Sequence, residues 1–416
     1  MGGGLMQLVA IGAQDVHLTG NPQISFFKVV YRRHTNFSME SIEQSFKGTP
    51  SPGNRVSCTI ARNGDLVTNV WLEVTLIPET SGNIRYVDSV GHALIEYVEL
   101  EIGGQRIDKH YGEWLDIWSE LTLPEDKREG FKYMIGRRNL GKFDPIPTNK
   151  LYIPLQFFFC RNPGLALPLI ALQYHEVKLN IKFRDASKLT TTGTTTGTGI
   201  NTVNLDDTIS SFEDVKLFVN YIYLDTDERQ RFAKMTHEYL IDQVQHTGAK
   251  NTTIEQVRLD FNHPVKELVW VIRDSTFDVL PSYGTEEYVH LQNMNSVLKR
   301  YNASFGLPRT ESFVSAKIQI NGHDRFAERE ASYFRLIQPY EHHTRIPQKH
   351  VYCYSFALNP ENHQPSGTCN FSRLDNVTIH LNGMHDKISN GELLVFALSV
   401  NVLRITSGMG GLAYSN

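Results

Sequence analysis

The chain has 416 residues and a formal net charge of −4, with 40% hydrophobic and 21% charged residues. This composition is typical of a folded protein with room for two domains, and it excludes a disordered or collagen-like chain. The slight negative charge disfavours direct nucleic-acid binding, and no apolar run approaches the roughly 20 residues of a membrane-spanning helix.

The N-terminal residues 1–24 are predicted to form a flexible arm. Their apolar run is short, is interrupted by Gln7 and has no basic residue ahead of it, so it is not typical of a signal peptide. The segment ISFFKVVY, residues 24–31, follows and leads into Arg32, Arg33 and His34.

The remainder of the chain contains an internal duplication. VTNVWLEV starts at Val67 and VKELVWVI at Val265, 198 residues later. HEVKLNI and DNVTIHL align Val177 with Val377, an offset of 200, and the Asn-Pro pairs at residues 162–163 and 359–360 are 197 residues apart. Agreement among separate anchors indicates two copies of one domain.

Two other anchors locate the insertions. Gly104 aligns with Gly322 at an offset of 218, and Asn220 with Asn401 at an offset of 181. The second copy therefore has extra residues within 273–300, and the first copy within 110–145 and 187–211. In the first of these insertions, Trp114, Ile117, Trp118 and Leu121 have helical spacing.

Alternation of apolar and polar residues within each copy predicts short antiparallel strands. Val177, Leu179, Ile181 and Phe183 alternate with polar residues, and so do Val377, Ile379 and Leu381. Such strands, separated by turn-rich segments, predict an all-β fold of two consecutive jelly-roll β-sandwiches with short helical excursions.

The predicted domains are an arm over residues 1–24, a first jelly roll over 25–224, a connecting helix over 225–240 and a second jelly roll over 241–416. Asp225 and Glu228 have the spacing of a capping box at the start of the connecting helix. Phe232, Met235 and Tyr239 would share one face of that helix.

Three local patterns imitate catalytic motifs. Gly136, Gly141 and Lys142 match the spacing of a phosphate-binding loop, but Phe143 replaces the hydroxyl residue and DPIP follows where a helix should begin. Ser296 and Lys299 match S-x-x-K without the partner motifs of acylating enzymes. His342 and His343 lie beside Glu341, with His350 downstream; these histidines lack metal-ligand spacing and are interpreted as surface or interface residues. We therefore predict no catalytic, cofactor-binding or metal-binding residues, no cofactor and no enzyme activity.

The remaining features have structural interpretations. Trp114 and Trp118 are predicted to be core residues, as are Phe232 and Tyr239, and TTTGTTTGTG is predicted to be a mobile surface loop. Cys58, Cys160, Cys353 and Cys369 form no C-x-x-C pair, which favours a reducing compartment. Sequons begin at Asn36, Asn251, Asn302, Asn370 and Asn376; three-residue matches are usually chance, and their glycosylation is left open.

Several segments together resemble a known family. They are GAQDVHLTGNPQISFFKVVYRRHTNF, SIEQSF, DLVTNVWLEVTLIP from Asp65 onward, and ELEIGGQRID. The chain resembles, over essentially its whole length, the major capsid proteins of nucleocytoplasmic large DNA viruses, whose two consecutive jelly rolls match the duplication.

The resemblance implies a structural protein of the virion. It implies homotrimeric, pseudo-hexagonal capsomers in an icosahedral shell assembled in the host cytoplasm, with neighbouring capsomers and minor capsid proteins as partners. Contact with an internal membrane would run through other proteins, and nucleic acid would not be bound directly. By resemblance the arm and the segment GNPQISFFKVVYRRHTNF, residues 20–37, would lie toward the inner face, with Arg32, Arg33 and His34 available to acidic partners. ISFFKVVY is also interpretable as a first core strand.

A second function class stays open from the residues alone. Twin jelly rolls also occur in carbohydrate-binding proteins and carbohydrate-active enzymes. That function would require a cleft with paired carboxylates or an aromatic platform.

Overall fold

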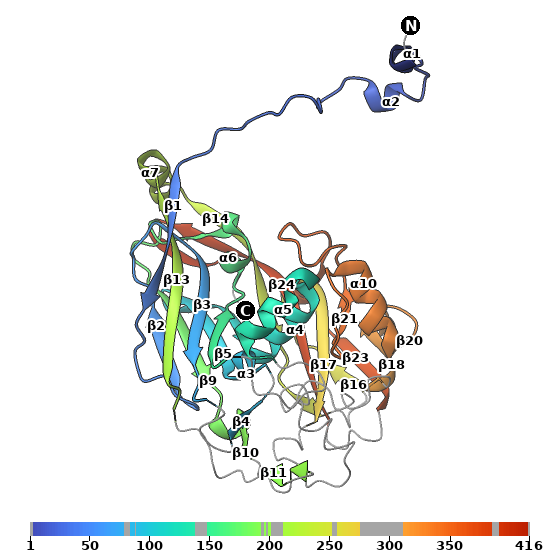
Figure 1. Ribbon diagram of the computed structural model, residues 1–416. Coiled ribbons are helices and arrows are strands. Elements are labelled where there is room, and N and C mark those ends of the chain that lie inside the picture. The colour runs from blue at the N-terminus through green and yellow to red at the C-terminus, as the bar shows by residue number, and fades with distance from the viewer. Residues whose placement is uncertain are drawn as a thin grey trace. The chain divides into compact units, whose positions relative to one another are not determined.

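The computed structural model describes residues 3–78, 84–87, 89–137, 148–192, 195–196, 199–200, 211–251, 256–274, 311–384 and 391–414 (Figure 1). It divides into two compact units, Met1–Phe37 and Ser38–Asn416. The N-terminal unit contains two short helices, α1 (Gly3–Val9) and α2 (Val16–Thr19).

The residues after α2 form no strand until β1 (Phe37–Gln44). Interpretation of ISFFKVVY as a first core strand is therefore wrong. Phe26 is 87% exposed and Phe27 97% exposed. A strand needs a partner strand and a covered face, and within its own unit this segment has neither.

The first jelly roll consists of two facing antiparallel sheets. Sheet 1A has the order β1-β13-β3-β7, with β8 also paired to β3, and sheet 1B has the order β2-β9-β5-β6. Their remaining strands are β2 (Arg55–Thr59), β3 (Leu66–Thr75), β5 (Ile95–Ile102), β6 (Gln105–Tyr111), β7 (Lys150–Pro154), β8 (Leu167–Pro168), β9 (Val177–Phe183) and β13 (Asp214–Leu224).

The second jelly roll repeats this arrangement. Sheet 2A has the order β14-β24-β17-β21, with β15, β22 and β25 paired at its margins, and sheet 2B has the order β16-β23-β18-β19, with β20 paired to β18. The strands are β14 (His237–His246), β15 (Lys250–Asn251), β16 (Gln256–Arg258), β17 (Pro264–Asp274), β18 (Phe313–Ile320), β19 (His323–Asp324), β20 (Arg329–Glu330), β21 (Tyr352–Ser355), β22 (Cys369–Asn370), β23 (Val377–Met384), β24 (Gly391–Thr406) and β25 (Met409–Leu412).

Strand register confirms the duplication. Val67 pairs with Leu167 and Val265 pairs with Cys369, so these two valines occupy the same position in β3 and β17. Val177 pairs with Ile102, and Val377 pairs with Ile320 in the same way. The equivalence of Val177 with Val377, inferred from the sequence offset, is therefore correct.

The turns that follow Ile102 and Ile320 are also equivalent. Gly103 and Gly104 have φ of 57° and 84°, and Asn321 and Gly322 have φ of 49° and 81°. Two successive positive φ angles are typical of the tight hairpin turn that matches strand twist, which explains the alignment of Gly104 with Gly322.

One sequence anchor is shifted by three residues. Val67 pairs with Tyr221 in the first roll, and Val265 pairs with Ser399 in the second, so the offset between β13 and β24 is 178. Asn220 is therefore equivalent to Leu398 and not to Asn401. Each roll has a register shift at this point, which a comparison of residue letters does not reveal.

Helices occupy the excursions between strands. The first insertion contains α4 (Gly112–Thr122) and α5 (Glu125–Ile135), as the helical spacing predicts. The second roll has a helical segment at the equivalent place, made of the π-helical turn η6 (Tyr333–Ile337) and α10 (Gln338–His342). The shorter helices are α3 (Val90–Ala93), α6 (Phe158–Arg161), η2 (Pro163–Leu165), η3 (Ala186–Lys188) and η7 (Phe371–Arg373).

The helix between the rolls is shorter than expected. α7 spans Thr226–Lys234, and the Asp225 side chain accepts a hydrogen bond from the Thr226 N–H at 2.8 Å. Tyr239 lies on β14, so Phe232 and Tyr239 do not share a helix face. They are connected by ring stacking through His237, with centroid distances of 5.3 and 5.9 Å.

Two small sheets lie in the 187–211 insertion and its surroundings. β10 (Thr190–Thr192) pairs with β4 (Ile84–Tyr86), and β11 (Thr195–Thr196) pairs with β12 (Gly199–Ile200). Most of the 273–300 insertion lies outside the described residues.

Two large apolar clusters and one small cluster around Leu66 form the described interior. One large cluster lies within the second roll and contains Leu268 and Trp270 on one face of β17. The other large cluster fills the first roll and extends to Val269 and Val271 on the opposite face of β17. Sheet 2A is thus buried on both faces, which fixes the two rolls against each other.

Candidate functional site

The junction between the two rolls is the most extensively built site in the described part of the chain. α4 contributes its aromatic side chains to this junction, where the ring of Trp114 lies 5.5 Å from that of Phe396 on β24. His246 on β14 stacks on the same ring at 4.4 Å. Trp114, Ile117, Trp118 and Leu121 are all buried, which confirms their prediction as core residues.

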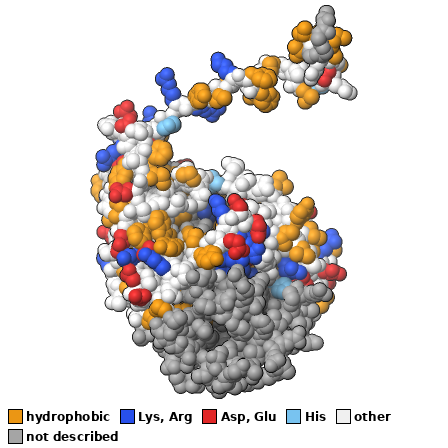
Figure 2. All heavy atoms as spheres, in the orientation of Figure 1, with side chains coloured by type: hydrophobic (Ala, Val, Ile, Leu, Met, Phe, Trp, Pro, Cys, Tyr) orange, Lys and Arg blue, Asp and Glu red, His pale blue; other side chains and the backbone are white. Residues whose placement is uncertain are grey.

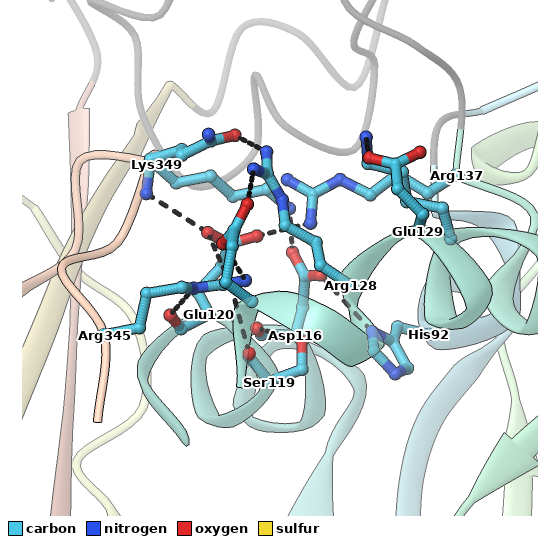
Figure 3. Close-up of polar contacts among 12 residues, drawn as sticks. His92, Asp116, Ser119, Glu120, Arg128, Glu129, Arg137, Arg345 and Lys349 are labelled. Atoms are coloured by element: carbon cyan, nitrogen blue, oxygen red, sulfur yellow. Dashed lines mark hydrogen bonds and ion pairs between the residues drawn. The ribbon is translucent and has the colours of Figure 1, made fainter. Parts of the chain in front are cut away.

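The same helix contributes Asp116 and Glu120 to a group of charged side chains, which we call the inter-roll cluster (Figure 3). Its members are His92, Asp116, Glu120, Arg137, Arg345 and Lys349. Asp116 forms an ion pair with Lys349 of the second roll, and its other oxygen lies 3.3 Å from His92 Nδ1. Glu120 forms an ion pair with Arg137, and Arg345 Nη2 of the second roll lies 3.3 Å from its Oε2.

Charge pairing keeps both acidic groups of the inter-roll cluster ionised. Burial alone would raise the pKa of Asp116, but Lys349 and the hydrogen bond from His92 hold that pKa well below its usual range. The pKa of Glu120 is likewise lowered, because Arg137 and Lys349 outweigh the effect of its burial. These buried charges are shielded from water, so each depends on its ion-pair partner for stabilisation, and removal of one partner would be destabilising.

The second roll also caps the C-terminal end of α4. Arg345 Nε donates to the carbonyl of Glu120 at 3.0 Å, and the Arg345 backbone N–H donates to the carbonyl of Leu121 at 3.1 Å. The last carbonyls of a helix have no partner within the helix and carry partial negative charge. Arg345 of the second roll therefore satisfies both carbonyls, that of Glu120 through its guanidinium and that of Leu121 through its backbone N–H, and this favours the observed packing of the two rolls.

The C-terminal hairpin forms a second connection. β25 folds back along β24, and Gly410 N–H lies 3.1 Å from His175 Nδ1 in the first roll. The Tyr174 N–H donates to the carbonyl of Gly408 at 3.0 Å, and the Leu412 N–H donates to Gln105 Oε1 at 3.1 Å. The C-terminal end of the second roll is thus attached to the first.

Buried charges also stabilise the register shift in β17. Lys266 is fully buried and donates to Asp242 Oδ1 at 3.0 Å and to the carbonyl of Asn362 at 2.9 Å. The next residue, Glu267, lies 2.9 Å from His343 Nε2, and His343 Nδ1 lies 2.9 Å from Glu361 Oε1. Two consecutive charged residues are accommodated because each has its own partners.

The histidine prediction is partly wrong. The side chain of His343 is fully buried and His350 is 5% exposed, while His342 is partly exposed and hydrogen-bonds to the carbonyl of Leu358 at 2.9 Å. Burial lowers the pKa of His343, but Glu267 and Glu361 raise it by more, so the net pKa is raised. The side chain is therefore an imidazolium that pairs with these glutamates. Within the described ranges, no three His, Cys, Asp or Glu side chains are grouped to hold a metal.

The matches to a phosphate-binding loop and to S-x-x-K form no site among the described residues. Gly136 ends α5 with φ of 67°, whereas Gly141 and Lys142 lie outside the described residues. Ser296, Lys299 and Asn302 also lie outside them. The other sequon residues, Asn36, Asn251, Asn370 and Asn376, are exposed, and Asn370 uses its side chain to accept from the Ser372 N–H at 3.0 Å.

All four cysteines are free thiols, as their sequence spacing suggests. Burial raises the pKa of Cys58 to about 11 and that of Cys160 to about 12. Both thiols are therefore protonated at neutral pH and unreactive.

A cleft of about 480 Å³ lies between β6 and β14. Asp108 and Tyr111 line it, but Asp108 Oδ1 accepts from the Val244 N–H at 3.0 Å and Oδ2 lies 2.7 Å from His110. The carboxylate of Asp108 therefore already has partners and helps to connect the two rolls.

No helix in the described ranges has the length and apolar character to cross a bilayer.

The fold and the junction define a double jelly-roll protein in which burial, ion pairing and capping hold two equivalent rolls together. Comparisons with known proteins agree. Residues 25–225 match the family model for the major capsid protein N-terminus, and residues 228–411 match that for the large eukaryotic DNA virus major capsid protein. The chain is 47% identical to the major capsid protein of Pyramimonas orientalis virus and 43% identical to that of Paramecium bursaria Chlorella virus 1, with 100% of each chain covered.

Solved structures give the same result. The chain matches the capsid protein in the PBCV-1 virus capsid with a TM-score of 0.77 and 37% identity, covering 94% of this chain and 100% of that one. The Faustovirus major capsid protein shares the fold, with a TM-score of 0.72 at 14% identity, over 95% of this chain and 94% of that one.

The chain therefore belongs to the major capsid proteins of large eukaryotic DNA viruses. Its relatives are structural proteins, so its role is structural and not enzymatic. The carbohydrate-binding alternative has no support from these relatives.

Proposed function

We propose that three copies of this chain form a closed capsomer that is one pseudo-hexagonal tile of an icosahedral shell. The observation that carries this proposal is the equivalence of the two rolls, which have the same sheet order and register. Three chains with two equivalent rolls each supply six similar units, so threefold symmetry gives a nearly sixfold outline.

The proposed partners are other copies of the capsomer and minor capsid proteins of the virion. The exposed arm, with Arg32, Arg33 and His34, would bind acidic partners on the inner face of the shell. Contact with an internal membrane would run through such proteins, and nucleic acid would not be bound directly. Assembly would take place in the host cytoplasm, whose reducing conditions suit four free cysteines.

The insertions would lie on the outer surface of the capsomer. Residues 187–211 and 273–300 differ in length between the copies, and a tiled shell tolerates such differences where they do not disturb neighbours. Limited proteolysis of intact particles tests this orientation. Protection of the TTTGTTTGTG loop together with ready cleavage of the arm would show the opposite orientation.

Native mass spectrometry of the purified chain tests the capsomer directly. We expect a species of three times the chain mass, and particle imaging should show tiles of hexagonal outline. A folded chain that remains monomeric at high concentration would contradict the proposal.

A further inference from the structure

The contact between α4 and sheet 2A supplies a template for a second contact. On that sheet, Val269 pairs with Phe396, and the two side chains are 0% and 1% exposed. Both belong to the apolar cluster that contains Trp114 of α4, whose ring lies 5.5 Å from that of Phe396. In sheet 1A, Trp71 pairs with Phe218 at the equivalent register position. The two rings stack with centroids 5.6 Å apart and an interplanar angle of 14°.

Sheet 1A lacks the cover that sheet 2A has. Trp71 and Phe218 remain partly exposed, and nearby Met39 and Tyr152 are 54% and 38% exposed. Figure 2 shows hydrophobic side chains gathered on this side of the molecule. Glu73, next along the same face, binds Lys150 at 2.8 Å, so the aromatic patch has a charged margin. An apolar centre with a polar rim is the usual composition of a protein interface.

A complementary helix face is exposed in the second roll. The helical segment made of η6 and α10 follows β20 in the same way that α4 follows β6. Its Phe334 and Gln338 are buried against its own roll, whereas Leu336, Ile337 and Tyr340 are 38%, 46% and 76% exposed. Ile337 and Leu336 lie three and four residues before Tyr340, and both spacings place a side chain beside that of Tyr340 on a helix surface. Residues Gly112 to Leu121 of α4 are, in contrast, all buried.

We propose that the Leu336, Ile337 and Tyr340 face of one copy docks on the Trp71 and Phe218 face of the next copy. This contact would repeat between chains the α4 contact that each chain makes within itself. The proposal rests on the trimeric capsomer proposed above and specifies the surfaces that close it. A second copy is the expected occupant for the following reason. Within one chain, the helix of the first roll packs on sheet 2A, so the equivalent helix of a second roll would pack on the equivalent position of sheet 1A.

The proposed contact is head-to-tail, since a helix face meets a sheet face. β13 and α10 lie on opposite sides of the Ser38–Asn416 unit in Figure 1, so one copy can use both surfaces at once. Head-to-tail contacts form either a closed ring or an open filament, depending on the rotation between copies. Three such contacts would close the capsomer.

The test uses full-length variants, each with one surface altered. Ile337→Glu alters the helix face, and Trp71→Glu alters the sheet face. Tyr340→Glu repeats the helix test at a more exposed position, where folding is least affected. The matched control is Val314→Glu, because Val314 is an apolar residue of the second roll that is 66% exposed and lies on β18 in sheet 2B, which contributes to neither surface. Circular dichroism and a cooperative thermal transition identify folded variants.

Native mass spectrometry and sedimentation then give the oligomeric state. We expect each surface variant to weaken trimer formation by at least about thirtyfold, while Val314→Glu remains trimeric. A mixture of Ile337→Glu and mass-tagged Trp71→Glu should give a one-to-one dimer that neither variant forms alone, since only one intact contact can be made.

Other outcomes separate this inference from the trimer itself. A trimeric wild type whose folded surface variants also remain trimeric would overturn the assigned surfaces and leave the trimer standing. Dimers formed by one variant alone would overturn the head-to-tail arrangement. A monomeric wild type would overturn the trimer, and the inference with it.

Discussion

His343 is a buried cation held between Glu267 and Glu361. Because its pKa is raised in the folded protein, it gains a proton more readily there than in the unfolded chain. The stabilisation from this group is therefore complete below about pH 6.5, the ordinary pKa of histidine, and is lost as the pH rises through the folded value.

The substitution His343→Gln should lower the free energy of unfolding by about 3 to 5 kcal/mol, since it leaves Glu267 without its buried partner. The advantage of the wild type should be larger at pH 6 than at pH 9, as measured by urea unfolding. His342→Gln is the matched control, because the neighbouring side chain is partly exposed and should change stability little. A wild-type advantage that grows toward pH 9 would contradict the ion-pair assignment.

Asp116 has the opposite dependence, because its pKa is lowered on folding. Asp116→Asn should cost about 3 to 5 kcal/mol at pH 7, since the buried ammonium of Lys349 loses the negative charge that it pairs with at this position. Its stabilisation is present above about pH 4 and is lost as the pH falls through the folded pKa, so the difference between wild type and variant should narrow in acid. Asp126→Asn, at an exposed position of α5, is the control. Equal stability of the Asp116 variant and the wild type in denaturant titrations would show that the inter-roll cluster contributes nothing.

Neither buried charge group could be predicted from the sequence. Asp116 and Lys349 are 233 residues apart, and only the packing of one roll on the other brings them together. The helical spacing of Trp114 and Trp118 did predict burial, because it depends on local geometry alone. His343 was misinterpreted because a polar letter beside Glu341 gives no indication of which glutamates approach it in space.

The β24–β25 turn connects the rolls through a position that only glycine fits. Gly408 has φ of 81°, and a Cβ there would lie 2.5 Å from the ring of Tyr174 in the first roll. Gly322 also has φ of 81°, but a Cβ there would meet no atom within 4 Å. The two turns share backbone conformation and differ in what surrounds them.

Gly408→Ala should therefore destabilise the protein more than Gly322→Ala. Both variants carry about 1 kcal/mol of backbone strain, and only Gly408→Ala also displaces β25 from the first roll. Thermal unfolding measures the difference, and hydrogen exchange at Tyr174 N–H should increase in the Gly408 variant alone. Equal effects would mean that the turn strain, and not the contact between rolls, limits stability.

Alternating residues and constant offsets predicted the strands of both rolls, because the strand period and the duplication are both visible in the letters. The alignment of Asn220 failed at the register shift, where the strands no longer pair residue for residue. The connecting helix ended early because the chain from His237 pairs with β24, which overrides the helical spacing of Tyr239.

The arm and the two-roll unit have different relations to stability. Residues 5–36 are all exposed, while Ser38–Asn416 is a compact unit of its own. Deletion of residues 1–36 should therefore change the free energy of unfolding by less than about 0.5 kcal/mol, as measured by denaturant titration. The same deletion should reduce the yield of closed particles if the arm binds inner partners. A large loss of stability would show that the arm packs on the unit.

The short connection between the rolls has a consequence for the order of events during assembly. β13 ends at Leu224 and β14 begins at His237, so the two rolls are tethered within a few turns of chain. Each roll therefore meets its covalent neighbour at a millimolar effective concentration, whatever the concentration of the protein in the cell. The contact between chains has no such tether and depends on how much protein has accumulated. Pairing of rolls within a chain should thus be complete at the lowest expression levels, and the onset of shell formation would be set by supply alone.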